Sequence, residues 1–207
     1  MKTHLAAIAA ATLALGGCVN FLPTPVIPLA LISLPPERAV TPSDQLQADV
    51  AVFAPESSRA FAGADIAVRD AQEMIYLSDV RWSDSAPMLL QSAVVNSLSK
   101  AGGPGRAVLG QLGAQTDYDV RWRIVDMSTG KETAPVRVEV QVSLMDSGTR
   151  RAIAQQSFSK EGTPSDRAPR ARAAELAKVA QQVADEVAAF VAKTVQPKPP
   201  LPGTTTR

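Results

Sequence analysis

Alternating apolar and polar residues mark three consecutive segments in the second half of the chain. Residues 118–127 and 136–144 alternate along their whole length, and residues 152–158 follow after a further turn. This period of two is typical of strands with one buried and one solvated face. Because short glycine-containing turns separate the segments, they predict an antiparallel meander. Its apolar side in the first two strands consists of Tyr118, Val120, Trp122, Ile124, Val136, Val138, Val140, Val142 and Leu144.

Shorter apolar runs in the first half predict further strands. Residues 29–34 stop at two prolines, and residues 47–53 alternate until the next proline. Residues 66–69 and 74–77 are two apolar runs joined by a polar connection of hairpin length, which predicts a β-hairpin. Residues 107–112, after a glycine-rich break, are a further candidate strand.

Two segments show the three-and-four spacing of amphipathic helices. The first begins near residue 86, carries Leu90, Val94 and Leu98 on one stripe, and ends at Gly102. The second covers residues 170–195 and is rich in alanine. The whole pattern predicts one α+β domain over residues 29–195, with a largely antiparallel sheet and two long helices packed on one face. The proline-rich residues 196–207 are expected to be a disordered tail.

The chain opens with a positively charged start and an apolar run that ends before its only cysteine. Leu15, Gly16 and Gly17 immediately precede Cys18, which is the layout of a bacterial lipoprotein signal. The apolar run is shorter than the roughly 20 residues that span a bilayer. The alternative is a buried helix with Cys18 as a core residue, but the order of the features favours a signal peptide at 1–17. Cys18 would then carry a diacylglycerol and acyl groups, with no other cofactor expected.

Residues 18–28 are predicted to be a lipidated tether, since three prolines interrupt any regular structure there. Two or more acyl chains hold a protein stably on a membrane. The residue after Cys18 is Val19 rather than aspartate, and in the well-known bacterial sorting pattern this predicts the periplasmic face of the outer membrane.

Processing also limits the chemistry of the mature chain. Removing residues 1–17 deletes the single histidine, and the single cysteine becomes acylated. Histidine-based acid/base catalysis, Ser/His or Cys/His nucleophiles and Cys/His zinc sites are therefore excluded. The full chain has 21 basic and 20 acidic residues, so loss of Lys2 leaves a neutral protein. This charge balance argues against a nucleic-acid partner.

A series of motifs resembles the ABC-type transport auxiliary lipoprotein family over most of residues 15–193. The strongest part is the tyrosine-containing hairpin followed by an Arg-Trp pair and a helix. The chain departs from the family at its first strand, where an aromatic residue is common. The matching residues are Asp65-Ile66-Ala67-Val68-Arg69, Met74-Ile75-Tyr76, Arg81-Trp82, Pro87, Leu89-Leu90-Gln91, Asp117-Tyr118-Asp119-Val120-Arg121 and the final alanine-rich helix.

The resemblance implies a periplasmic lipoprotein that accompanies an ABC transporter and its MCE-domain substrate-binding protein. Such systems move phospholipids or other hydrophobic molecules between the two membranes. The protein would be a non-catalytic docking subunit at the outer-membrane end, with a ring of identical subunits as its implied assembly.

Tyr76, Arg81 and Trp82 are the candidate partner-binding residues, because tryptophan is enriched at interface hot spots and an arginine can meet an acidic partner or lipid headgroups. For Arg81 the alternative is an ordinary solvated charge on a strand. Core packing is the alternative for Tyr76 and Trp82, as it is for Trp122, since all three sit in apolar patterns. Two other functions stay open: an interaction lipoprotein of another envelope machine, such as a cell-wall synthase activator or secretion pilot, and an envelope hydrolase. The hydrolase would need an Asp/Glu pair or a Ser/Lys dyad, and no such spacing is evident.

Overall fold

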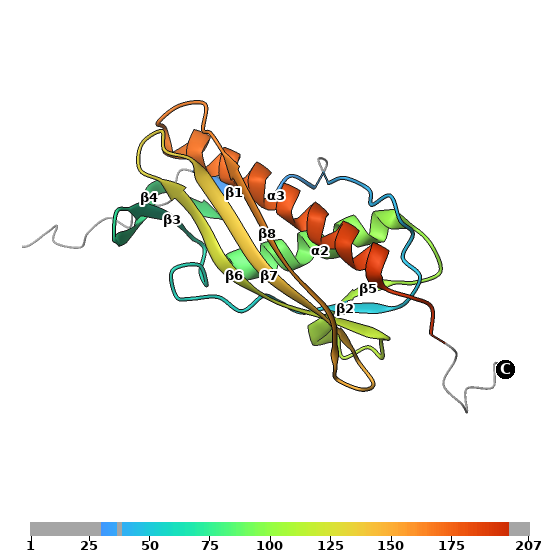
Figure 1. Cartoon of the computed structure of the whole chain (residues 1–207). Coiled ribbons are helices and arrows are strands. Elements are labelled where there is room, and N and C mark those ends of the chain that lie inside the picture. The colour runs from blue at the N-terminus through green and yellow to red at the C-terminus, as the bar shows by residue number, and fades with distance from the viewer. Residues whose placement is uncertain (1–29, 37–38, 199–207) are drawn as a thin grey trace, which may run out of the picture.

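The computed structural model describes residues 30–36 and 39–198 of the 207-residue chain (Figure 1). The predicted signal peptide (1–17) and tether (18–28), including Leu15, Gly16, Gly17 and Cys18, lie outside the described residues, as do residues 199–207. In the described part, eight strands form one mixed sheet and two helices pack on it. The predicted class, a single α+β domain, is confirmed.

Three long antiparallel strands form the spine of the sheet: β6 (Tyr118–Gly130), β7 (Val136–Asp146) and β8 (Ala152–Gly162). Every second residue of β7 from its start to Leu144 is buried, which confirms the predicted meander. The alternation of β6 breaks at a β-bulge after Ile124, where one extra residue shifts the buried side of the strand.

Two groups of shorter strands attach to the opposite ends of β6, on the edge that β7 leaves free. At the start of β6, β2 (Val50–Val52) lies parallel to it and β5 (Ala107–Leu109) lies parallel to β2. At the end of β6, β3 (Asp65–Asp70) lies parallel to it. β4 (Glu73–Trp82) pairs antiparallel with β3, and β1 (Ala30–Ile32) pairs parallel with β4. The sheet therefore forks, with one strand group at each end of β6 (Figure 1).

The predicted sheet was largely antiparallel, and most of the strand pairing observed is antiparallel; the short parallel pairings that make the sheet mixed were not predicted. Its three long pairings are antiparallel, and its four short pairings are parallel. Alternation along a strand shows which face is buried but not the direction of its neighbour. The candidate strand at 107–112 also ends early, because Gly110–Leu112 form a 3₁₀ turn, η2.

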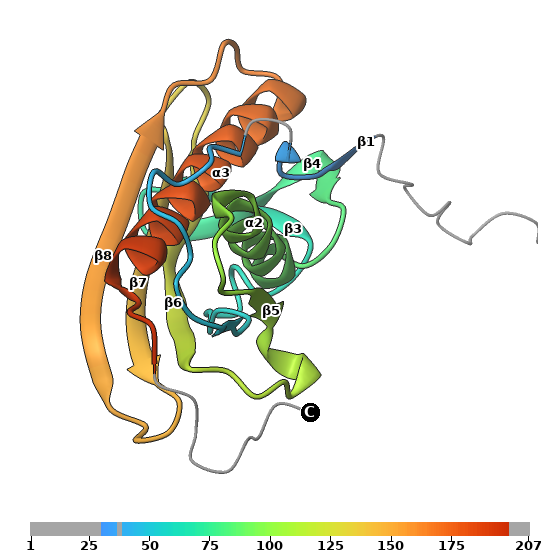
Figure 2. The same ribbon diagram turned by 90° about the vertical axis from the view of Figure 1, so that its right-hand side faces the viewer.

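The two helices, α2 (Ala86–Ala101) and α3 (Pro169–Thr194), lie on the same face of the sheet, as predicted (Figure 2). α3 packs on β6, β7 and β8, and α2 lies between α3 and the β2–β5 end. Leu90, Val94 and Leu98 are all buried, so the apolar stripe of α2 faces the core. α2 ends at Gly102, whose φ of 66° suits glycine. We call the opposite, helix-free side the outer face.

A buried carboxylate holds the segment between β1 and β2 on the helices. Asp185 of α3 accepts hydrogen bonds from Ser97 Oγ (2.6 Å), Gln181 Nε2 (2.9 Å) and the backbone N–H of Val40 (3.1 Å). The N-terminal segment is thereby fixed to both helices before the chain enters β2.

Candidate functional site

The β3–β4 hairpin, residues 65–82, projects from one end of the sheet, and we call it the arm (Figure 1). Its two strands do not match in length. Between the pairs Asp65–Arg81 and Ala67–Tyr76, β3 advances two residues and β4 advances five. Three extra residues of β4 therefore bulge outward, and Asp79 in the bulge has a φ of 59°. Bulges of this kind redirect side chains and interrupt strand pairing.

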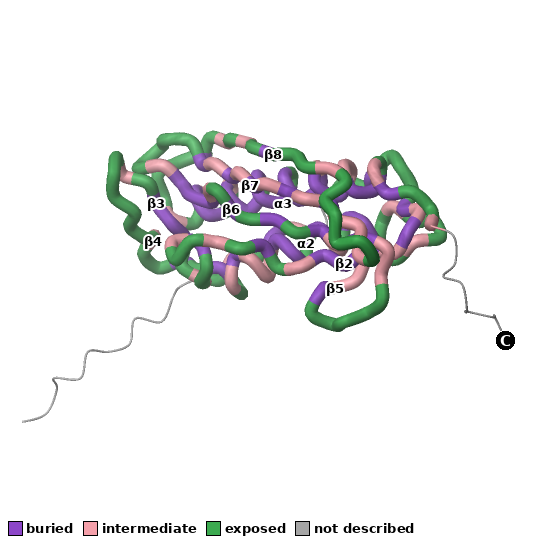
Figure 3. The backbone as a smooth tube through the Cα atoms, turned by 60° about the horizontal axis from the view of Figure 1, so that its bottom comes forward, coloured by how far each residue is buried: buried purple, intermediate pink, exposed green. Residues whose placement is uncertain are grey.

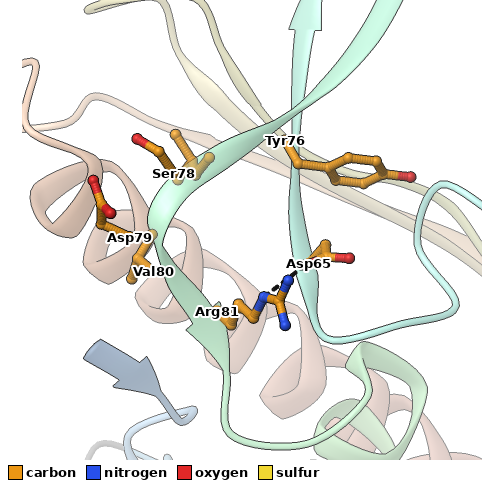
Figure 4. A pocket seen from close by; sticks show the side chains of 7 residues that line it. Asp65, Tyr76, Ser78, Asp79, Val80 and Arg81 are labelled. Carbon is orange, nitrogen blue, oxygen red and sulfur yellow. Dashed lines mark ion pairs between the residues drawn. The ribbon is translucent and has the colours of Figure 1, made fainter. Parts of the chain in front are cut away.

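The bulge borders an open cavity of about 340 Å³. At its inner end, Arg81 Nε lies 2.9 Å from Asp65 Oδ1, and both side chains are about half exposed. Figure 4 shows this ion pair between the two strands, with Tyr76 beyond it and Ser78 and Asp79 on the far side of the bulge. An ion pair so exposed contributes little to stability, so it is available for recognition.

Exposed apolar side chains flank the ion pair. Met74, Ile75 and Tyr76 are 39%, 46% and 48% exposed, and Leu31, opposite Arg81 on β1, is 64% exposed. Figure 3 shows the tip of the arm as exposed, in contrast to the buried centre of the domain.

Strand register places part of this surface on the outer face. Tyr76 pairs with Ala67, and Ala67 pairs with Ser128. The neighbour of Ser128, Thr129, accepts a hydrogen bond from Arg172 of α3, so Thr129 points to the helices and Ser128 points away. We define the outer strip as Leu31, Asp65, Met74, Tyr76 and Arg81.

The β3 side of the arm is fastened to β6. Arg69 pairs with Asp126 and donates to Ser128 Oγ over 2.6 Å. Lys131 lies 2.8 Å from Asp70 at the tip, and this hydrogen bond and charge raise the pKa of Lys131. By contrast, β1 pairs only with Val80–Trp82, so the rest of β4 has no strand on its other edge within the described residues.

The three candidate partner residues have different environments. Tyr76 and Arg81 are exposed and belong to the outer strip. Trp82 is only 2% exposed and packs in the core, so it is not a surface residue and the core alternative holds for it. Trp122 is also buried, and its Nε1 donates to the carbonyl of Phe53 over 2.6 Å. For Tyr76 the core alternative is wrong, because its side chain is exposed. The sequence did not show this, since alternation along β4 does not reveal that the arm extends beyond the helices.

A second concavity, which the sequence analysis missed, lies at the other end of the sheet. This β5 groove has a volume of about 700 Å³. No motif signals it, because its residues come from four separate segments. They are Asp49, Ala51, Phe53, Gly110, Gly113, Ala114, Gln115, Thr116, Asp117, Asp119, Ser147, Gly148 and Lys198.

Lys198 closes one side of this groove. Its Nζ lies 2.6 Å from Asp146 Oδ2 and 2.7 Å from the carbonyl oxygen of Asp117, and 4.5 Å from the ring centre of Tyr118. The hydrogen bond from Lys198, followed by those from Thr149, lowers the pKa of Asp146 from 3.8 to about 2. Tyr118 Oη also donates to the carbonyl of Gln196 over 3.1 Å. Gln196 and Lys198, the first and third residues of the predicted tail, therefore contact the domain.

Among residues 30–36 and 39–198, no group of three or more His, Cys, Asp or Glu side chains could hold a metal ion. In the same residues, no helix is long and apolar enough to cross a bilayer.

Comparison with known proteins gives a family match. The family model for the ABC-type transport auxiliary lipoprotein component matches residues 31–188. A search of curated proteins finds no match.

Several solved structures are similar to this chain. A DUF330 protein from Xanthomonas campestris superposes with a TM-score of 0.67 and 20% identity, covering 75% of this chain and 91% of that one. An uncharacterized protein gives a TM-score of 0.60 and 13% identity, covering 78% and 97%. A PelC dodecamer from Paraburkholderia phytofirmans gives a TM-score of 0.45 and 14% identity, covering 74% and 93%. At these identities the first two structures show a shared fold alone, and no conclusion is drawn from the third.

Proposed function

Since the chain belongs to the ABC-type transport auxiliary lipoprotein family, we propose that it is a non-catalytic docking subunit held at the outer membrane by a lipid on Cys18. Its partner is the MCE-domain protein of an ABC transporter that moves lipids or other hydrophobic molecules between the membranes. The outer strip, with Tyr76 and Arg81, is the surface that binds this partner. The exposure of this strip beside β1, where the described chain enters the domain, is the observation that carries the proposal.

The direction of β1 supports this arrangement. β1 runs parallel to β4, and β4 runs from the tip of the arm into the domain. The chain therefore enters the domain travelling from the side to which the arm points. Ala30 follows Cys18 by twelve positions, which span up to about 40 Å when extended. A lipid on Cys18 would keep the arm close to the membrane.

The composition of the outer strip also suits a protein partner. Tyrosine, arginine and methionine are enriched in interface cores, and a half-exposed tyrosine beside an ion pair provides both apolar area and orientation. Trp82, beneath the strip, supports its backbone from the core. The strip is thus a preformed surface on a stable ladder.

Site-specific photo-crosslinking tests the docking role. A photoreactive residue at position 76 should crosslink to the MCE-domain protein in intact cells, whereas one at Gln155, on exposed β8, should not. Tyr76→Ala with Arg81→Ala should abolish co-purification of that protein. A crosslink from position 76 only to cell-wall synthesis or secretion proteins would overturn the transport role.

The anchor has its own test. Cys18→Ala should move the protein from the membrane fraction to the soluble periplasmic fraction, because the acyl chains would be absent. Membrane association of this variant, or mass spectrometry showing an unprocessed amino terminus, would overturn the lipidation of Cys18 and the cleavage after Leu15, Gly16 and Gly17.

We propose further that identical subunits assemble into a ring. A ring needs two different complementary surfaces on each copy. β8 pairs only with β7, and most of β4 pairs only with β3, so the described residues present two unlike strand edges. Native mass spectrometry of the detergent-solubilised protein should show one closed oligomer, and a monomer at micromolar concentration would contradict it.

A further inference from the structure

A third concavity, which we call the outer pocket, lies on the outer face between the arm and the β5 groove. Arg121 and Arg123 alternate with buried residues of β6, so their side chains leave the sheet on the side without helices. Each is paired with a polar residue of β7, and paired residues share a face. The pocket has a volume of about 220 Å³, and its lining residues are Glu56, Arg121, Trp122, Arg123, Gln141 and Ser143.

Both arginines of the outer pocket are held in place by their neighbours. The guanidinium carbon of Arg121 lies 3.3 Å from the centre of the Phe53 ring, a stacked arrangement that arginine favours. Arg123 Nε donates a hydrogen bond to Gln141 Oε1 over 3.0 Å. A guanidinium has five N–H donors, so each arginine keeps donors for a ligand. Because the two groups are already ordered, a ligand that binds them meets a smaller entropic cost.

The carboxylate of Glu56 stands opposite these cations. Its backbone pairs with Arg123, yet the Arg123 side chain turns to Gln141 instead. Among residues 30–36 and 39–198, the Glu56 carboxylate has no hydrogen bond or ion pair. The outer pocket therefore presents an unpaired negative group and two ordered positive groups within one small space.

This charge pattern selects the chemistry of a ligand. A plain anion would be repelled by Glu56, and a plain cation would be repelled by the two arginines. A zwitterion that carries a phosphate and a primary ammonium satisfies both sides. Its phosphate accepts charge-assisted hydrogen bonds from guanidinium groups, and its ammonium has three donors for a carboxylate. A volume of about 220 Å³ is below the roughly 300–1,000 Å³ of pockets for drug-sized ligands, so it suits a group of this size.

We propose that the outer pocket binds a phosphoethanolamine group. The phosphate is bound by Arg121 and Arg123, with the Ser143 hydroxyl as a further donor, and the ammonium is bound by Glu56. The group exists as a free solute and as the headgroup of a phospholipid. The lining is polar except for Trp122, so the pocket takes the headgroup alone. This inference goes beyond the docking function, since none of these residues belongs to the outer strip.

Titration of free phosphoethanolamine into the full chain in a non-ionic detergent tests the site. NMR of the arginine and glutamine side-chain N–H groups should show saturation in the millimolar range, as expected for a few exposed charge pairs. Arg123→Gln should weaken binding at least about five-fold, because it removes charge-assisted hydrogen bonds. Arg151→Gln is the matched control: it removes the same charge from an exposed arginine outside the pocket and should leave the affinity unchanged.

Glu56→Gln tests recognition of the ammonium. The parent chain should prefer phosphoethanolamine to glycerol 3-phosphate, which has a phosphate but no ammonium, and Glu56→Gln should lose this preference. Absence of saturation, an equal loss in Arg123→Gln and Arg151→Gln, or an unchanged preference in Glu56→Gln would overturn the proposal. These titrations involve neither Cys18 nor the MCE-domain protein, so they succeed or fail independently of the docking function.

Hydrogen exchange of the full chain in vesicles identifies the source of the group. Vesicles of phosphatidylcholine alone are compared with vesicles that also contain phosphatidylethanolamine, whose ammonium can donate hydrogen bonds to Glu56. Slower exchange of residues 119–125 and 139–145 in the second vesicles would assign the pocket to the lipid headgroup. Equal exchange in both vesicles, with saturation by free phosphoethanolamine, would assign it to the free solute. Peptides from the arm, residues 65–82, are the control.

Discussion

The two ends of β6 carry strand groups of similar design, but they are finished in opposite ways. Both groups begin with a short strand parallel to β6 and continue with a second strand. At the β2–β5 end, side chains seal the structure: Gln91 Nε2 donates to the carbonyl of Val52 over 2.7 Å, and Trp122 donates to Phe53. At the arm end, Met74 and Tyr76 remain exposed.

The two ends of β6 therefore serve different purposes: one stabilises the fold, and the other presents a surface for recognition. The β2–β5 end uses its polar side chains to satisfy backbone groups, which stabilises the fold. The arm end keeps its polar and aromatic side chains at the surface, where they contribute little to folding. A protein that must be both rigid and able to bind can assign these tasks to different ends of one strand.

The largest effect is expected from a change that removes the support of both ends. Val183, in the middle of α3, is fully buried between the sheet and α2. Val183→Asp places an unpaired carboxylate there and should lower the free energy of unfolding by about 3–5 kcal/mol. Gln182→Asp, at the exposed neighbouring position, is the matched control and should change it by less than about 0.5 kcal/mol. Thermal unfolding measures the difference. Equal melting temperatures for the two variants would show that α3 does not pack as described.

A smaller effect should separate the two ends directly. A Cβ at Gly105, beside β5, would lie 2.3 Å from the carbonyl oxygen of Ala48, and backbone atoms move at high cost. Gly105→Ala should therefore destabilise the protein by about 1–3 kcal/mol. A Cβ at Gly63, before the arm, would meet only the backbone nitrogen of Asp65 at 3.9 Å, so Gly63→Ala should be neutral or slightly stabilising. Urea midpoints measure both, and a larger loss at Gly63 would reverse the comparison.

The sequence predicts the spine and both helices because their signals are local. Alternation over 118–127 and 136–144 and the stripe of Leu90, Val94 and Leu98 each depend on neighbouring residues. The stripe and the alternation over 136–144 are confirmed, and the alternation over 118–127 is confirmed as far as Ile124, where the bulge begins. The direction of pairing is not local: nothing in Val50–Val52 shows that it runs parallel to β6. The mixed sheet was therefore not predictable from alternation alone.

The candidate site was predictable only in part, for a similar reason. Tyr76, Arg81 and Trp82 lie on one strand, yet only Trp82 is buried in the core. The β5 groove left no sequence signal, since Asp49, Asp117 and Asp119 meet only through the parallel pairing of β2 with β6. The sequence analysis did not single out Asp185, whose charge is accommodated in the interior because Ser97, Gln181 and the backbone of Val40 donate hydrogen bonds to it.

Acid should weaken the β2–β5 end more than the arm. The pKa of Asp146 is about 2 in the folded protein against 3.8 ordinarily, so its contribution is present above about pH 4 and is lost as the pH falls toward 2. Lys198→Ala removes the largest cause of this shift. The variant should therefore lose less stability than the parent chain between about pH 4 and pH 2, with the pKa of Asp146 raised toward its ordinary value.

Urea midpoints at both pH values, together with an NMR titration of the Asp146 carboxyl, check this expectation. Lys178→Ala is the control, since it removes an exposed pair with Glu175 within one helix. A titration of Asp146 that is the same with and without Lys198 would show that Lys198 does not act on this carboxylate.

The smallest effect on stability is expected at the arm, and it is the most informative about function. Tyr76 is 48% exposed, so Tyr76→Ser removes surface that is already in contact with water and should change the free energy of unfolding by less than about 0.5 kcal/mol. Trp82→Ser, six residues along the same strand, opens a core cavity and should cost about 3–5 kcal/mol. Thermal unfolding of both variants, with partner co-purification measured beside it, completes the comparison.

Loss of partner binding in Tyr76→Ser at unchanged melting temperature is the expected result, because the strand that Trp82 anchors from within still presents the rest of the outer strip. A Tyr76→Ser protein that binds normally would remove this residue from the docking surface, whatever its effect on folding.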